Sequence, residues 1–279
     1  MPVFLTLLGV AVSLLMLYAF LILPRMTDRA DLDLVSTDHA RGGLSSPEIP
    51  PYTLRAIRAA CEAGYGIELR VRLSRDGRIV VYPNSDLRAC GSKASVEELD
   101  VATLMSMRVM GSRERIATLR EVLELVDGRA PLLIEPVSTD KRHTLLIRLS
   151  RMLDTYAGAF AIESSDVQTL VWFKNYRPRF ARGQILPTPN QSTPKEQRLY
   201  RFATSHMLLN VRTRPDFLVA HPRSMRSPVF RICTSLLGCR AFICPITTEK
   251  ERRACRAKGY FTVFKTFGLK TGHSTKGVK

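Results

Sequence analysis

Residues 67–87 read IELRVRLSRDGRIVVYPNSDL. Apolar and polar residues alternate over the first seven positions, which is the period of a β-strand. The segment Arg75-Asp76-Gly77 predicts a tight turn, and the apolar run 79–82 predicts a second short strand. Three charged residues share one face of the first strand: Glu68, Arg70 and Arg72. Charged side chains are rarely buried without partners, so this face of the strand is either exposed to solvent or lines a polar site.

Strand-like and helix-like patterns alternate along most of the chain. The first strand is expected at Leu34–Asp38 and the first helix of this series at Tyr52–Ala63. Two later helices begin with capping-box patterns, Ser95-x-x-Glu98 and Thr118-x-x-Glu121. Repeated β-then-α units predict an α/β fold with a parallel sheet. The chain has 279 residues, and the 256 that follow position 23 are the length of a closed (β/α)8 TIM barrel, which is typically about 250 residues.

Residues Val3–Leu23 carry no charge and predict a membrane-spanning helix. Such a helix reaches about 31 Å at ~1.5 Å per residue, the thickness of the hydrocarbon layer. A cleaved signal peptide would need a basic start and a small-residue cleavage site, and neither is evident. Arg25 and Arg29 follow the helix and no Lys or Arg precedes it. The positive-inside rule then predicts a single-pass cell-membrane protein with a cytoplasmic barrel.

The chain is expected to divide into a transmembrane anchor (1–23), a linker (24–33), a barrel (34–267) and a basic tail (268–279). Its net charge of +17 is uneven: residues 1–150 hold 19 basic and 18 acidic residues, and residues 151–279 hold 23 and 7. The basic second half is either a solvated surface or a face for an anionic partner. The six cysteines form no recognisable zinc pattern and fit free thiols in a reducing compartment.

Several motifs, in order, resemble those of the glycerophosphodiester phosphodiesterase family. Residues 67–87 are similar to its IELDVxLTKDGxxVVxHDxxL block, residues 38–42 (DHARG) to its AHRG, and Pro47-Glu48 to its PEN. Further similarities are RIATLREVL at 115–123, LIEPV at 133–137 and RPDF at 214–217. The resemblance runs from about His39 to Phe264. It implies a TIM barrel of the phospholipase-C-like phosphodiesterase type.

The same resemblance implies roles for a few residues. Arg41 matches a catalytic and substrate-binding arginine, and Glu48 a substrate-binding carboxylate. The family's two catalytic histidines fall on Ala40 and Pro83. His39 is one position away and, by strand alternation, is expected to point away from the site unless a bulge re-aims it.

The family holds a Ca²⁺ or Mg²⁺ ion with three carboxylates. Two of these match Glu68 and Glu135, while Arg70 stands in place of the third. We therefore expect no metal and no other cofactor, with Glu68 and Glu135 as vestigial ligands and Arg70 as the replacement. A guanidinium between the two carboxylates would supply the positive charge that the cation provides elsewhere.

Three functions are compatible with these features. The first is a catalytically degenerate domain, a pseudoenzyme, that binds phospholipid headgroups, a glycerophosphodiester or a partner at the membrane. The second is an active phosphoric diester hydrolase of lipid metabolism that uses His39 with His143, His206 or His221. The third is nucleic-acid binding, which the basic half favours but for which no motif is present. The sequence does not specify the ligand or the oligomeric state.

Overall fold

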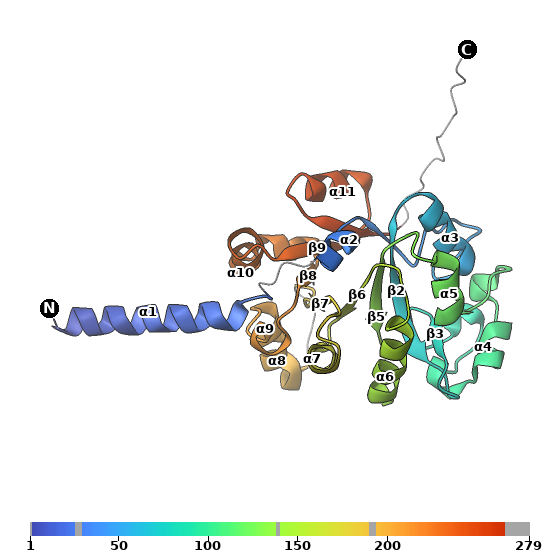
Figure 1. Cartoon of the computed structure of the whole chain (residues 1–279), viewed down its shortest axis with the longest axis horizontal. Coiled ribbons are helices and arrows are strands. Elements are labelled where there is room, and N and C mark those ends of the chain that lie inside the picture. Colours follow the sequence, from blue (N-terminus) through green and yellow to red (C-terminus); the bar gives the residue numbers. More distant parts are fainter. Residues whose placement is uncertain (1, 26–29, 138–139, 190–193, 266–279) are drawn as a thin grey trace, which may run out of the picture.

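The computed structural model describes residues 2–25, 30–137, 140–189 and 194–265. Within these ranges, eight parallel strands close into a barrel, because β1 pairs with both β2 and β10. The barrel strands are β1 (His39–Arg41), β2 (Gly66–Leu73), β5 (Leu132–Pro136), β6 (Phe160–Ser164), β7 (Arg182–Ile185), β8 (Phe217–Ala220), β9 (Arg240–Ile246) and β10 (Phe261–Phe264). The predicted TIM barrel is confirmed (Figure 1).

Helices cover the outside of the barrel: α3 (Leu54–Glu62), α5 (Leu119–Val126), α6 (Arg142–Leu153), α7 (Val167–Tyr176), α8 (Arg198–Ser205), α9 (Asn210–Thr213), α10 (Pro228–Arg231) and α11 (Glu249–Arg256). Each of the two predicted capping boxes forms, at Ser95 and at Thr118. The second begins α5, and the first begins a 3-10 turn ahead of α4 (Val101–Ser106).

Residues 67–87 contain most of β2 and all of β3 (Ile79–Val81), and the two strands are joined by the predicted turn at Gly77. β3 pairs antiparallel with β2 and then with β4 (Ala117–Thr118). The three strands extend the barrel wall beyond its rim. They support a small separate core under α4, which lies at the far right of Figure 1.

Alternation along the strands creates two apolar layers. Side chains that point outward, such as Ala40 and Ile67, pack against the helices in the largest core cluster. Side chains that point inward, such as Phe217 and Phe242, fill the barrel interior. The barrel interior is thus a packed apolar core, and buried polar side chains such as Glu68, Glu135 and Glu163 lie beside it.

The lower end of the barrel is closed by α2 (Ala30–Val35), where a linker and a first strand were expected. The strand prediction at Leu34–Asp38 is wrong: β1 starts later, at His39. Leu32 and Val35 of α2 belong to the interior cluster, with exposed fractions of 8% and 0%. A short apolar segment reads as a strand or a helix equally well, and here tertiary packing selects the helix.

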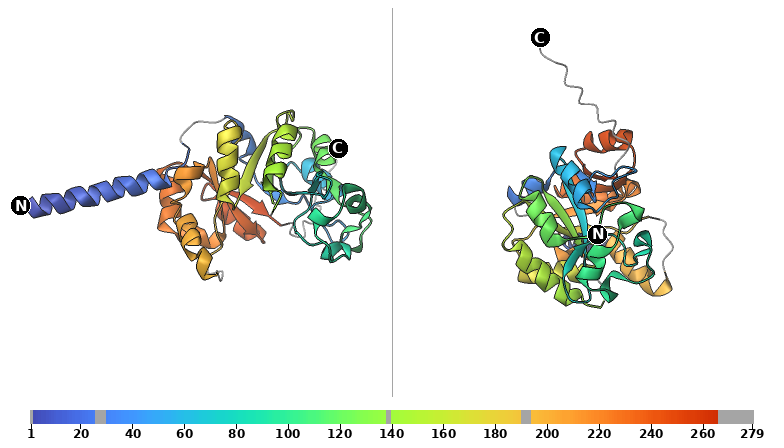
Figure 2. Two further views of the ribbon diagram at one scale, coloured as in Figure 1. Left: turned by 90° about the horizontal axis from the view of Figure 1, so that it is seen from below. Right: turned by 90° about the vertical axis from the view of Figure 1, so that its right-hand side faces the viewer.

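Helix α1 (Pro2–Ile22) projects from the barrel as a straight rod. Residues Val3–Ile22 are long and apolar enough to cross a membrane, by length and composition. Only 6% of the span is buried against the rest of the protein. The left view of Figure 2 shows the same projection from a second direction, with the barrel at one end of the rod. The predicted basic tail, 268–279, lies outside the described residues.

Candidate active site

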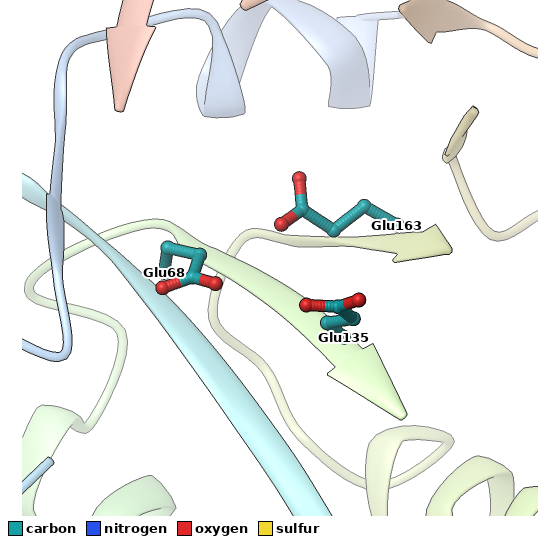
Figure 3. A group of neighbouring side chains, drawn as sticks. All are labelled: Glu68, Glu135 and Glu163. Carbon is teal, nitrogen blue, oxygen red and sulfur yellow. The ribbon is translucent and has the colours of Figure 1, made fainter. Parts of the chain in front are cut away.

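Three glutamates meet inside the upper part of the barrel. Glu68 lies on β2, Glu135 on β5 and Glu163 on β6, and all three side chains are buried. One carboxylate oxygen from each lies within 4.8 Å of the others. Figure 3 shows the three carboxylates pointing toward one another from neighbouring strands. Glu135 and Glu163 lie in the carboxyl-terminal part of their strands, where TIM barrels carry their functional groups, and Glu68 pairs in register with Arg41, the last residue of β1.

Two arginines lie against these carboxylates. The Arg70 Nε atom is 2.6 Å from Glu135 Oε2 and 3.7 Å from Glu68 Oε1. Arg41 approaches Glu68 from the other side, with Nε 3.6 Å from Oε2. The register of β2 places Arg70 directly beside Glu135, and that of β1 places Arg41 beside Glu68. The pairing of parallel strands therefore creates the cluster from residues far apart in the chain.

Glu68 has a third partner that was not anticipated from the sequence. The Tyr52 hydroxyl donates a hydrogen bond of 3.0 Å to Glu68 Oε2. Tyr52 sits in a left-handed conformation, φ 65°, and its ring covers Gly42 so closely that a Cβ there would lie 2.6 Å from a ring carbon. Gly42 itself has φ 67°, a conformation that glycine adopts without penalty. The Gly42 of the predicted motif therefore makes room for the tyrosine that orients Glu68.

The pKa values of the ionisable groups in this cluster are shifted by burial and by their charged neighbours. Burial raises the pKa of Glu163 well above its usual range, and the neighbouring carboxylates of Glu68 and Glu135 raise it further. Among the described residues, Glu163 forms no salt bridge, and its Oε2 has no hydrogen-bond partner. Burial lowers the pKa of Arg70, but Glu135 and Glu68 more than offset this, so Arg70 stays charged. Burial raises the pKa of Glu68 as well, and Arg41 and Arg70 oppose this shift. Two guanidinium groups thus lie against a cluster of three carboxyl groups, two of which have raised pKa values.

We expect Glu163→Gln and Glu135→Gln to have opposite consequences at neutral pH. Glu163→Gln copies the protonated form and should leave the melting temperature unchanged or raise it. Glu135→Gln leaves Arg70 without its closest anion and should lower stability by about 1–3 kcal/mol. Thermal unfolding of the two variants, which change the same group on adjacent strands, gives the comparison. Equal destabilisation by both would mean that Glu163 is ionised.

His39 points into the barrel interior, contrary to expectation. It lies on the same side of β1 as Arg41, whereas Ala40 faces the helices. Its ring fits where Gly66 lacks a side chain, packs edge-on to Phe242, and hydrogen-bonds through Nδ1 to the Thr37 carbonyl at 2.9 Å. The side chain is fully buried in the apolar layer, and this burial lowers its pKa to about 4. His39 is therefore a neutral interior residue at physiological pH.

The other residues considered from the sequence lie outside the cluster. Glu48 is exposed and lines a separate surface cavity of about 430 Å³ with Arg55 and Met110. His143 is exposed at the start of α6, and His206 bonds the Phe202 carbonyl on α8. His221 follows β8 and caps a 3-10 turn. Among the described residues, no histidine hydrogen-bonds or ion-pairs with Glu68, Glu135 or Glu163.

Glu163 is the site residue that the sequence analysis missed. It occupies the fourth position of β6, as Glu135 does of β5. The printed β5–β6 register ends one pair earlier, at Ile134 and Ile162, and Glu135 and Glu163 are the next residues of the two strands. Their carboxylate oxygens meet at the cluster, so both side chains point inward. The sequence contains one signal for it, because Glu163 is an acidic residue at the end of the strand expected at Ala159–Glu163. Tyr52 carried no such signal, because its contact depends on an unusual backbone conformation.

The fold is a TIM barrel with a cluster of buried acidic groups and two arginines among its strands. The chain belongs to the glycerophosphoryl diester phosphodiesterase family, whose model matches residues 43–222. The expected family resemblance is thereby confirmed. No curated protein matches the sequence.

Solved structures with the same fold include several phosphodiesterases. A phosphodiesterase from Oleispira antarctica, in complex with the product sn-glycerol-3-phosphate, shares 20% identity at a TM-score of 0.69 and covers 84% of this chain and 94% of its own. A glycerophosphodiester phosphodiesterase from Thermotoga maritima shares 22% identity at 0.63, covering 83% and 94%. One from Agrobacterium tumefaciens shares 18% at 0.64, covering 83% and 96%. These similarities establish the fold.

Proposed function

We propose that this protein is a catalytically degenerate member of its family that binds a phosphodiester at the mouth of the barrel. The observation that carries the proposal is the position of Arg70 between Glu135 and Glu68. A fixed guanidinium there, with that of Arg41 at Glu68, offsets the charge of two carboxylates that would otherwise repel each other or take up protons. On this proposal the positive charge at the site comes from the Arg70 side chain and not from a bound metal ion.

The residues present fit a divalent cation poorly. Ca²⁺ and Mg²⁺ require carboxylate oxygens at about 2.0–2.6 Å from the ion. Arg70 Nε already lies 2.6 Å from Glu135, and Arg41 and Tyr52 lie against Glu68. An ion shared by both carboxylates would lie beside the Arg70 guanidinium, whose charge would repel it on approach. We therefore assign no step to a metal.

Two arginines are the groups that would contact the ligand. Arg41 and Arg70 are partly open to solvent, with side-chain exposed fractions of 20% and 29%. A guanidinium offers forked donors that match two oxygens of a phosphodiester. Glu48, matched to a substrate residue by the family resemblance, is exposed and lines a separate surface cavity, so we assign it no ligand contact. We propose Arg41 and Arg70 as the principal anchors.

The second candidate function is that of an active hydrolase, and the cluster of three carboxylates is the observation in its favour. Hydrolysis of a phosphodiester also needs a general acid or base close to the reacting oxygens. His39 is fully buried below the cluster, and Ala40 faces the helices. We propose that neither supports turnover.

Binding of glycerophosphocholine to the full-length protein, measured by calorimetry, tests the proposal. We expect saturable binding that weakens as salt rises, because the contacts are ionic. Arg41→Ala should lower the affinity by about tenfold or more, corresponding to the loss of one charge-assisted contact. Arg75→Ala is the matched control, since Arg75 pairs with Asp100 on the exposed surface. Equal affinity in the Arg41→Ala variant, or no binding at all, would contradict the proposal.

We also propose that α1 anchors the protein in the cell membrane with the barrel in the cytoplasm. The two arginines that follow α1 and the free cysteines support this orientation. Cys61 and Cys90 are half-buried and serve as reporters. In intact cells, an impermeant thiol reagent should leave both unlabelled until the membrane is permeabilised. Labelling without permeabilisation would place the barrel outside.

A further inference from the structure

A cavity of about 610 Å³ lies on the outside of the barrel, between the β2–β3 turn and the helices α4, α5 and α6. Figure 1 shows these three helices and β3 together on the right of the molecule. None of the residues assigned to the candidate active site lines this cavity. Cavities that bind small molecules have volumes of about 300–1,000 Å³, so its size is that of a ligand site.

The charged residues that line the cavity are all basic. They are four arginines, Arg78, Arg120, Arg148 and Arg151, and no aspartate or glutamate of the described chain lines it. All except Arg148 are exposed and form no salt bridge or side-chain hydrogen bond with a described residue. By contrast, Arg75 on the same turn pairs with Asp100 at 3.0 Å. A hollow lined by charges of one sign attracts the opposite charge, so the cavity favours an anion.

Arg148 is held against the β2–β3 turn. Its Nη1 atom donates a hydrogen bond to the Gly77 carbonyl. Gly77 has a φ of 80°, and a Cβ at this position would lie 2.6 Å from Arg148 Nη1. Glycine therefore provides both the left-handed backbone of the turn and the space that the guanidinium occupies. One of the four cationic groups is thus oriented before any ligand binds, which reduces the entropy cost of binding.

The remaining lining of the cavity is largely apolar. Ile79 is 5% exposed, and Val101, Met105 and Met152 are half-buried. Methionine side chains are flexible and adapt their shape to an apolar ligand. Met152 and Arg120 also line an adjoining cavity of about 650 Å³ beside α5 and α6. The two cavities are therefore neighbours, which leaves room for an extended aliphatic chain.

We infer that this cavity is a second binding site, separate from the glutamate cluster, and that its ligand is an aliphatic carboxylate. The forked donors of a guanidinium match the two oxygens of a planar carboxylate, and the four arginines supply these donors. The methionines, with Ile79 and Val101, cover the aliphatic chain. A cation with the same chain would be repelled, and an anion without a chain would leave the apolar lining in contact with water.

Methyl NMR of the full-length protein in nanodiscs, with ¹³C-labelled methionine methyl groups, tests this site directly. Titration with octanoate should shift the Met105 and Met152 signals along one saturable curve. Met225, which does not line the cavity, should not shift. Octylammonium has the same chain and the opposite charge, and acetate has the same charge and no chain. Each of these two should bind at least tenfold more weakly than octanoate.

Arginine variants connect the binding to the cavity. A double variant, Arg120→Ala with Arg151→Ala, should weaken octanoate binding at least tenfold, since it removes two exposed guanidinium groups of the lining. The matched control is Arg55→Ala with Arg58→Ala, two exposed arginines of α3 that do not line the cavity, and it should keep the affinity within twofold. Melting temperatures equal to that of the parent show that both variants are folded. The assignment would be overturned by unshifted Met105 and Met152 signals, by an equal response to octylammonium, or by unchanged affinity in the Arg120 and Arg151 double variant.

Discussion

Arg70→Ala is expected to lower the melting temperature of the full-length protein in detergent by about 5–10 °C. Removing one member of a buried ion pair costs about 3–5 kcal/mol, and the partial exposure of Arg70 reduces this to about 2–3 kcal/mol. For a domain of this size, 1 kcal/mol corresponds to about 2–4 °C. The loss arises because Glu68 and Glu135 remain buried and lose the charge between them. Scanning calorimetry of parent and variant measures it.

The same variant should acquire a response to calcium. Without the guanidinium, three carboxylates lie close enough to share one ion. Millimolar Ca²⁺ should then restore part of the lost melting temperature, since an ion that binds only the folded state stabilises it. Arg70→Lys keeps the charge but not the forked donors and should be intermediate without calcium. Arg75→Ala, at an exposed pair, should change the stability by less than about 1 kcal/mol. An Arg70→Ala variant as stable as the parent would contradict the role assigned to Arg70.

The parent protein is expected to show no measurable hydrolysis of glycerophosphocholine or glycerophosphoethanolamine, with or without Mg²⁺ or Ca²⁺. General acid–base catalysis contributes about 10²–10⁴-fold, and a bound metal contributes several kcal/mol more. The expectation follows from the proposed function, in which Arg70 stands where the ion would bind and no histidine among the described residues contacts the three glutamates. The Thermotoga maritima glycerophosphodiester phosphodiesterase, assayed in parallel, controls for the substrate preparation. Release of glycerol 3-phosphate is the quantity to follow.

Point variants allow this assay to distinguish a catalytically degenerate domain from an active hydrolase. His39→Ala should leave the rate at background, since the ring is buried against Gly66 and Phe242. Ala40→His should not restore activity either, because residue 40 faces the packed helices and a histidine there would be crowded. Turnover at ordinary enzymatic rates that His39→Ala abolishes would establish the second candidate function instead.

The barrel was predictable because its signals are local. The alternation at 67–73, the turn at Gly77 and the capping boxes at Ser95 and Thr118 each depend on neighbouring residues, and each is present in the structure. The family match added the strand order, which no local pattern encodes. The closure of the barrel bottom by α2 was not predictable in this way, because Leu32 and Val35 become helical only by packing into the interior.

The site was predictable in part. Glu68, Arg70 and Glu135 were named from the sequence, and strand register does bring them together. Glu163 was missed because its role depends on the register between β5 and β6. His39 was predicted to point away from the barrel interior, because the motif alignment assigned the inward position on β1 to Ala40. In the structure His39 points inward and Ala40 faces the helices. These are questions of strand register and direction, which the motif alone does not determine.

The central claim is that Arg70 supplies the positive charge that a metal ion would supply in this site. Calorimetric titration of the unmodified full-length protein with Ca²⁺ and with Mg²⁺, together with melting curves in either ion and in chelator, tests it most directly. The account predicts no binding heat at the site and one melting temperature under all conditions. Saturable binding of either ion with a rise in melting temperature, lost in a Glu68→Gln variant, would contradict it.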